Sequence, residues 1–301
     1  MNFKSIFFYL STTFLILAGA AATLFIQETI DYKAAKERYA ESLFFKDRLF
    51  APEEWTGAQA ANPFLLKAQE QQRGIDKRRS AVQQHLWMLL GVILIYSIYT
   101  LFLYARNKNA KALSFGMICV AMICLYAGLF SPMLEIAAYE RNLDLGKIPI
   151  KTKVFGMEVD FQLEKKFEGD LYFYYQSKSV VELIQLLFQQ RNWVVGVSIL
   201  MFSILFPLSK VLLSLVSIFR NRPLESKWSK FWLLKSGKWS MADVFVVAVF
   251  LSYLAFNSMQ VGVKAESNAL AGLYFFLAYC LLSISTSSLL ETEWKEKSVP
   301  L

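Results

Sequence analysis

The sequence predicts an all-α polytopic membrane protein with about six transmembrane helices. Hydrophobic residues make up 55% of the 301 residues and aromatic residues 16%, which is more apolar surface than a soluble domain of this size buries. A helix crosses the hydrocarbon core with roughly 20 mostly apolar residues, and the roughly ten-residue alternation of a membrane β-barrel is missing here. The predicted spans are residues 6–26, 86–105, 113–134, 193–219, 241–262 and 269–290.

The first of these spans has an alternative interpretation. Lys4 precedes an apolar run that reaches the small residues Ala18, Gly19 and Ala20, as in a cleaved signal peptide. The run continues to Ile26, however, which is long enough to cross a bilayer. An uncleaved membrane anchor is therefore favoured.

Basic residues beside the spans predict the topology. They cluster in the connections 106–112 and 220–240 and form no single stripe, so the net charge of +8 predicts no nucleic-acid partner. Connections rich in Lys and Arg stay in the cytoplasm, so both termini should be cytoplasmic. The segments expected outside are 27–85, 135–192 and 263–268.

One basic cluster disagrees with this topology. The positions of the tryptophans support the predicted span ends. Residues 77–79 are basic and lie near the predicted outer end of a span, but long loops follow the charge rule less strictly. Tryptophan is enriched at membrane interfaces, and all but one of the tryptophans fall near a predicted span end. These are Trp87, Trp193, Trp228, Trp232, Trp239 and Trp294.

The chain divides into two parts. Residues 1–105 form an N-terminal transmembrane hairpin with a polar extracytoplasmic excursion, which is rich in helix-forming residues. Because Pro52 and Pro63 interrupt this excursion, it should form two polar helices. Residues 106–301 form a four-helix unit with an extracytoplasmic insert at 135–192.

The insert changes its periodicity along the chain. Residues 148–154 and 157–163 alternate in polarity and 171–175 are rich in aromatic residues, which predicts a small antiparallel sheet. Ser179 is a plausible N-cap, and the apolar positions within 180–188 predict an amphipathic helix on the outer surface. That helix could cap the bundle or bind a partner.

The sequence predicts no enzyme, metal or cofactor site. Cys119, Cys124 and Cys280 lie within spans without a CxxC spacing, and His85 is the single histidine, so neither a zinc site nor a disulfide framework is expected. The chain also has no phosphate-binding loop of the form GxxxxGK[ST], so it should not hydrolyse ATP.

Lys210 is the charge placed deepest inside a predicted span. An unpaired lysine there costs roughly 2.5–3.5 kcal/mol, and an intramembrane charge is a functional hypothesis by default. Asp243, in the cytoplasmic half of the next span, is the expected partner, and a kink at Pro207 could open a polar pocket. Alternatively Lys210 reaches to the interface, and Ser240 with Asp243 forms a helix-capping box.

Hydroxyl residues in the last span complete this candidate network. In one interpretation, they pack helices by bonding to their own backbone or across helices. In the other, Ser283 or Thr286 faces Lys210 and Asp243. The hydroxyls concerned are Ser283, Ser285, Thr286, Ser287 and Ser288.

Two motifs resemble the paraquat-inducible protein A family. Residues 206–210 (FPLSK) resemble the P-L-x-K segment of that family. Residues 236–245 (SGKWSMADVF), which contain Gly237 and Trp239, resemble its G-[RK]-W-S-M-x-D-V-F segment. Pro132 resembles the proline that ends the family's first helix, and Ser283 stands where the family has threonine. The resemblance covers residues 113–290, as one unit without the zinc ribbons that many members carry.

The resemblance implies a function that the residues alone do not. It implies an inner-membrane subunit of a lipid-trafficking system that binds membrane lipids and works with an MCE-domain protein in the periplasm. Lys210 and Asp243 would couple an energy source to lipid loading or extraction. The alternatives are a non-transporting membrane scaffold or envelope-stress protein, and a small-solute transporter.

Overall fold

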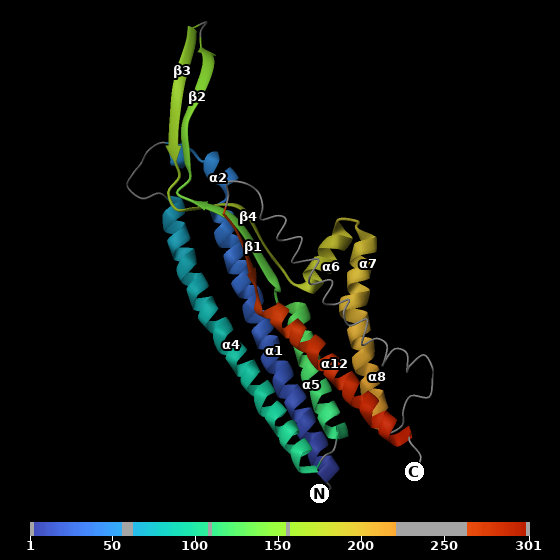
Figure 1. The fold of residues 1–301 in the computed structure, drawn as a ribbon. Helices are drawn as coiled ribbons and strands as arrows, with labels where there is room; N and C mark the ends of the chain where they lie inside the picture. The colour runs from blue at the N-terminus through green and yellow to red at the C-terminus, as the bar shows by residue number, and fades with distance from the viewer. Residues whose placement is uncertain (1–2, 56–62, 108–109, 155–156, 221–263, 299–301) are drawn as a thin grey trace.

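The computed structural model describes residues 3–55, 63–107, 110–154, 157–220 and 264–298 (Figure 1). Within these residues, five helical stretches are long and apolar enough to cross a membrane. They correspond to five of the six predicted spans and confirm the polytopic helical class. The remaining predicted span, 241–262, lies outside the described residues. The five stretches are Phe7–Ser42, Leu66–Arg106, Ala110–Phe130, Trp193–Ile218 and Ala271–Leu289.

Two long helices, α1 (Phe3–Ser42) and α4 (Pro63–Asn107), form the N-terminal hairpin. At 1.5 Å per residue, the 40 residues of α1 extend about 60 Å, which is about twice the hydrocarbon thickness. Each predicted polar helix is therefore a continuation of a transmembrane helix. The basic residues near 77–79 lie on this extension, where Arg78 contacts Asp31 of α1 at 3.0 Å.

Two short helices, α2 (Phe45–Leu49) and α3 (Pro52–Trp55), follow α1. Proline suits the first position of a helix, where the missing N–H has no intrahelical acceptor, and both α3 and α4 begin at a proline. Arg48 of α2 is fully buried and contacts Glu54 at 2.6 Å. Arg48 Nη2 also donates to the Glu168 carbonyl at 3.1 Å. This bond links the short helices to a distant part of the chain.

Helices α5 (Ala110–Phe130) and α12 (Ala271–Ser298) form the centre of the bundle. A Cβ atom at Gly128 of α5 would lie 2.7 Å from the backbone nitrogen of Phe276, so the two helices approach closely because this residue is glycine. The hairpin packs against this centre, where the ring centroids of Phe25 of α1 and Phe275 of α12 lie 5.5 Å apart.

Two antiparallel sheets lie at one end of the bundle, which we call the sheet end (Figure 1). The three-stranded sheet has the order β4-β1-β5, with β1 at Leu134–Arg141, β4 at Asp170–Lys178 and β5 at Lys264–Ala269. The two-stranded sheet pairs β2 (Asp144–Val154) with β3 (Met157–Lys166), and it projects away from the bundle.

The sheets confirm the predicted small antiparallel sheet and extend it. The pairing of Val154 with Met157 fixes the predicted hairpin. The sequence predicted one sheet within residues 135–192, whereas the structure has two. Strand β5 also lies in residues 263–268, which were expected to be a short connection. Its partner β1 is far away in the sequence, and its own residues (KAESNA) lack apolar alternation.

The predicted amphipathic helix is α6 (Val180–Gln189). Ser179 caps it, since its hydroxyl accepts from Glu182 N while the Glu182 carboxylate accepts from Ser179 N, a complete capping box. A transmembrane stretch then runs through α7 (Trp193–Leu200), a π-helical turn η1 (Met201–Leu205) and α8 (Phe206–Arg220).

Candidate functional site

Lys210 lies on α8 and is 8% exposed. It follows the π-helical turn that ends just before Phe206 and Pro207. Proline has no N–H to donate to the carbonyl four residues earlier, which is that of Ser203. A π-helical turn is one way for a helix to absorb such an interruption, and these turns are frequent at functional sites. The structure therefore has a π-helical turn on the N-terminal side of Pro207, whereas the predicted kink with its polar pocket stays a prediction.

Three serines accompany Lys210 on this span. Ser214 and Ser217 follow it on α8 by four and seven residues, spacings that recur on one side of an α-helix. Ser203 precedes it by seven residues and lies in the turn η1. Ser203 is 1% exposed, and the other two are 4% exposed. We call these four residues the polar face of α8, with Ser203 of η1 included. Sequence reasoning singled out Lys210 alone, although the spacing of the serines was visible in the sequence.

Three hydroxyl residues of α12 are buried, and the hydroxyls of Thr286 and Ser287 bond within their own helix. Ser283, Thr286 and Ser287 are each less than a tenth exposed. Thr286 Oγ1 donates to the Leu282 carbonyl at 2.8 Å, and Ser287 Oγ donates to the Ser283 carbonyl at 2.9 Å. This is the arrangement expected if these residues serve helix packing. Their contact with Lys210 stays a prediction.

The rest of the predicted network lies outside the described residues. This applies to Asp243 and Ser240, and also to Gly237 and Trp239 of the family motif. The pairing of Lys210 with Asp243 therefore stays a prediction. Pro132 is described, and it lies at the sheet end between α5 and β1, where its carbonyl accepts from Gly272 N at 3.3 Å.

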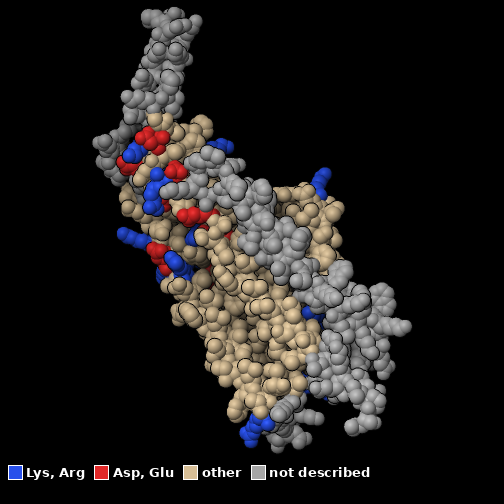
Figure 2. Space-filling view, in the orientation of Figure 1, with Lys and Arg blue, Asp and Glu red and all other residues tan. Residues whose placement is uncertain are grey.

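A second polar region lies at the sheet end. Figure 2 shows charged side chains gathered there, while most of the visible middle of the bundle is uncharged. Lys33 Nζ lies 2.6 Å from Glu182 Oε1. Lys36 Nζ lies 2.8 and 2.9 Å from the two carboxylate oxygens of Glu135. We call these four residues the ionic cluster, and it joins α1 of the hairpin to α6 and β1.

The ionic cluster was missed by sequence reasoning. Its lysines stand three residues apart on one polar helix, which places them on one face. That spacing was the signal available in the sequence, but it did not indicate which carboxylates the lysines contact. The side chains of Lys33 and Glu135 are each 7% exposed, so the folded chain removes both charges from water.

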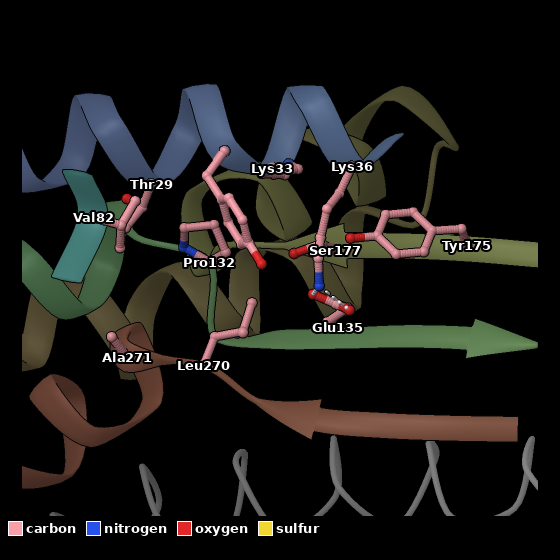
Figure 3. Close-up of a pocket in the computed structure, with 11 residues that line it drawn as sticks. Thr29, Lys33, Lys36, Val82, Pro132, Glu135, Tyr175, Ser177, Leu270 and Ala271 are labelled. Carbon is pink, nitrogen blue, oxygen red and sulfur yellow. Dashed lines mark hydrogen bonds and ion pairs between the residues drawn. The ribbon is translucent and has the colours of Figure 1, made fainter. Parts of the chain in front are cut away.

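A cavity of about 80 Å³ lies beside the ionic cluster (Figure 3). Lys36, Glu135, Tyr175 and Ser177 line its polar side. Ser177 is 2% exposed, and among the described residues neither its hydroxyl nor that of Tyr175 has a hydrogen-bond partner. Burial, with a smaller contribution from Glu135, raises the pKa of Tyr175 above its ordinary value of 10.0. The Tyr175 hydroxyl is therefore neutral and able to donate at physiological pH.

No metal site is found in the described part of the chain. No group of three or more His, Cys, Asp or Glu side chains lies close enough there to hold an ion. Cys119 and Cys124 are buried in α5, where packing is their role in the fold.

Fold and site together define a multi-pass helical membrane protein with a sheet at one end and a buried polar face on one span. Residues 168–296 match the model of the paraquat-inducible protein A family. The match confirms, over these residues, the resemblance that the two motifs indicated, and it includes the polar face of α8. The hairpin at 1–105 lies outside the match. No curated protein and no solved structure matches the chain.

Proposed function

We propose that this chain is an inner-membrane subunit of a lipid-trafficking system. In this proposal it is not an enzyme but loads or extracts membrane lipid for an MCE-domain partner in the periplasm. Support comes from the membrane fold and from the family match at residues 168–296, which suggests a membrane protein of the cell envelope. Fold and family alone do not define a substrate.

The observation that carries the proposal is the burial of Lys210 among the serines of the polar face of α8. Ionisable residues inside membrane spans are costly, and they commonly mark substrate or ion pathways. A purely structural helix would place leucine or alanine at these positions at lower cost. Lys210 with Asp243 is the pair proposed to couple an energy source to lipid movement.

The orientation in this proposal puts the sheet end in the periplasm. Helix α1 begins and α12 ends at the opposite end of the bundle (Figure 1). The basic connection 106–112 joins α4 to α5 at that same end. Because basic connections stay in the cytoplasm, both termini would be cytoplasmic. The projecting β2–β3 ribbon would then reach toward a periplasmic partner.

That ribbon also favours the scaffold alternative. A two-stranded ribbon offers unpaired strand edges, which can dock a partner without any transport. Shortening the ribbon would then abolish function, whereas substitutions at Lys210 would not. The two functions therefore predict opposite outcomes for Lys210.

The test compares Lys210→Met and Asp243→Asn with a matched control, Leu212→Ala. Leu212 lies on the same helix and is 60% exposed, as expected for a lipid-facing residue. The lipid carried by MCE-domain proteins captured from the same cells is measured by mass spectrometry, and insertion of each variant by resistance to alkaline extraction. Loss of that lipid in both charge variants, but not in the control, supports the proposal. Normal lipid loading in both would refute the coupling role.

A further inference from the structure

We propose that the cavity beside the ionic cluster binds the phosphoethanolamine headgroup of a membrane phospholipid. This inference rests on the proposed function and deepens it by naming a headgroup. The cavity is built jointly by the hairpin, which supplies Lys36, and by strands β1 and β4, which supply Glu135 and Ser177 (Figure 3). Lys36 and Glu135 both lie outside the family match, so the proposal for this site rests on the residues of this chain.

The cavity lies at the depth of a lipid headgroup. Four parts of the bundle meet at the cavity, and each contributes a residue near the end of its span. Thr29 follows the apolar stretch of α1, Pro132 comes two residues after the end of α5, Ala271 begins α12, and Val82 lies where the apolar part of α4 starts. Span ends mark the boundary of the hydrocarbon core, where lipid headgroups lie. A headgroup therefore reaches the cavity without leaving its leaflet.

The charges beside the cavity complement those of the headgroup. Lys36 and Glu135 present an ammonium and a carboxylate 2.8 Å apart. A zwitterionic headgroup carries the complementary pair, so its ammonium can bond Glu135 while its phosphate bonds Lys36. Every charge then keeps a partner, which buried charges require. A primary ammonium donates hydrogen bonds to Glu135, whereas the trimethylammonium of phosphatidylcholine has no N–H to donate.

Two hydroxyls beside the cavity are suited to bind the phosphate. Ser177 Oγ and Tyr175 OH are buried and make no hydrogen bond to any described residue. Both lie on the same side of the cavity as Lys36. Buried donors without acceptors are costly and uncommon in native structures, and phosphate oxygens are strong acceptors. A bound phosphate satisfies both hydroxyls and completes a four-residue site.

The size of the cavity limits the ligand. Its volume of about 80 Å³ has room for a few waters or one small polar group. Acyl chains do not fit, so they would stay in the surrounding bilayer. The site therefore selects lipids by their headgroup and does not discriminate between acyl chains.

Binding is tested on the purified full chain by native mass spectrometry. The probes are phosphatidylethanolamine, phosphatidylcholine, phosphatidylglycerol and diacylglycerol with identical acyl chains, and free phosphoethanolamine as competitor. The variants are Ser177→Ala, Tyr175→Phe and the double change Lys36→Met with Glu135→Gln, which leaves no lone charge. The matched control is Arg141→Gln with Asp170→Asn, which removes an exposed ion pair of 2.8 Å from the same sheet.

The wild type and the control should retain phosphatidylethanolamine at least about fivefold better than the other three lipids, a difference of roughly one hydrogen bond. The three site variants should lose this preference while keeping their unfolding temperature in lipid-free detergent. Equal retention of all lipids by the wild type, as for a cavity filled by water only, would overturn the proposal. So would an unchanged preference in every variant, or binding of free phosphoethanolamine as tight as that of the lipid.

Failure here is distinguishable from failure of the proposed function. The binding measurement needs neither a partner nor an energy source, whereas lipid loading of the MCE-domain protein needs both. Normal lipid loading of the MCE-domain protein without a headgroup preference would refute the cavity assignment alone. A headgroup preference without any loading would refute the proposed function, while the cavity would remain a lipid-binding site.

Discussion

Lys33 and Glu182 are 149 residues apart in the sequence, yet their side chains meet at 2.6 Å. The same carboxylate accepts from Ser179 N at 2.9 Å and so begins helix α6. One side chain therefore fixes the start of α6 and also holds α1 of the hairpin against it. This contact therefore links the hairpin to the part of the chain that the family model matches.

Substitutions at Glu182 separate these two roles. Glu182→Gln keeps a side chain able to complete the capping box but leaves the buried Lys33 ammonium without its nearest carboxylate. It should lower the free energy of unfolding by about 1.5–3 kcal/mol. Glu182→Ala should cost about 1 kcal/mol more, because the cap is also lost. Thermal unfolding in detergent measures both changes.

Lys33→Met is the companion change. In the double variant Lys33→Met with Glu182→Gln no buried charge is stranded, so it should be more stable than Glu182→Gln alone. Additive losses would show instead that the two residues do not interact, and would contradict the bridging role.

Arg48 and Glu54 form the most deeply buried ion pair in the described residues, with side chains 0% and 3% exposed. Arg48→Met should lower the stability by about 3–5 kcal/mol, because it leaves a buried carboxylate and removes the donor to Glu168 O. Arg141→Met breaks an ion pair whose arginine is 66% exposed, and it should leave the unfolding temperature nearly unchanged, because exposed ion pairs contribute little to stability. Similar unfolding temperatures for the two variants would contradict this assignment.

Tyr172 and Tyr175 predict how stability depends on alkaline pH. Burial is the main cause that raises the pKa of both above the ordinary value of 10.0. Above pH 10 the unfolded chain loses these protons while the folded chain keeps them, so stability should be full below pH 10 and fall as the pH rises further. Tyr175→Phe removes one of the two groups and should make this fall shallower. Unfolding temperatures of the wild type and Tyr175→Phe, measured between pH 9 and pH 11, test this prediction. If both lose stability equally steeply with pH, the result would count against burial of the Tyr175 phenol.

Local signals in the sequence predicted much of this fold correctly. The apolar runs predicted five described spans, and the Ser179 cap with its amphipathic pattern predicted α6, because hydropathy and capping depend on neighbouring residues. The alternation at 148–154 and 157–163 likewise predicted the β2–β3 hairpin, whose strands are adjacent in sequence.

Contacts between distant segments were missed for the opposite reason. Strand β5 has no apolar alternation and exists because β1 pairs with it. Lys33, Lys36 and Arg48 stand in polar segments where a solvated charge is the ordinary expectation, and only the fold brings Glu182 and Glu135 to the two lysines. Lys210 could be predicted because a charge in an apolar span is anomalous by itself.

Gly128 gives a test of the packing between α5 and α12. A Cβ atom there would lie 2.7 Å from the backbone nitrogen of Phe276 and 2.9 Å from its Cα, and a backbone cannot rotate away as a side chain can. Gly128→Ala should therefore push the helices apart and cost about 1–3 kcal/mol. Gly91, in the transmembrane part of α4, is the matched control because a Cβ there meets nothing within 4 Å. Gly91→Ala should be neutral or slightly stabilising, since alanine favours the helix. If the two alanine variants unfold at the same temperature, the close approach of α5 and α12 is wrong.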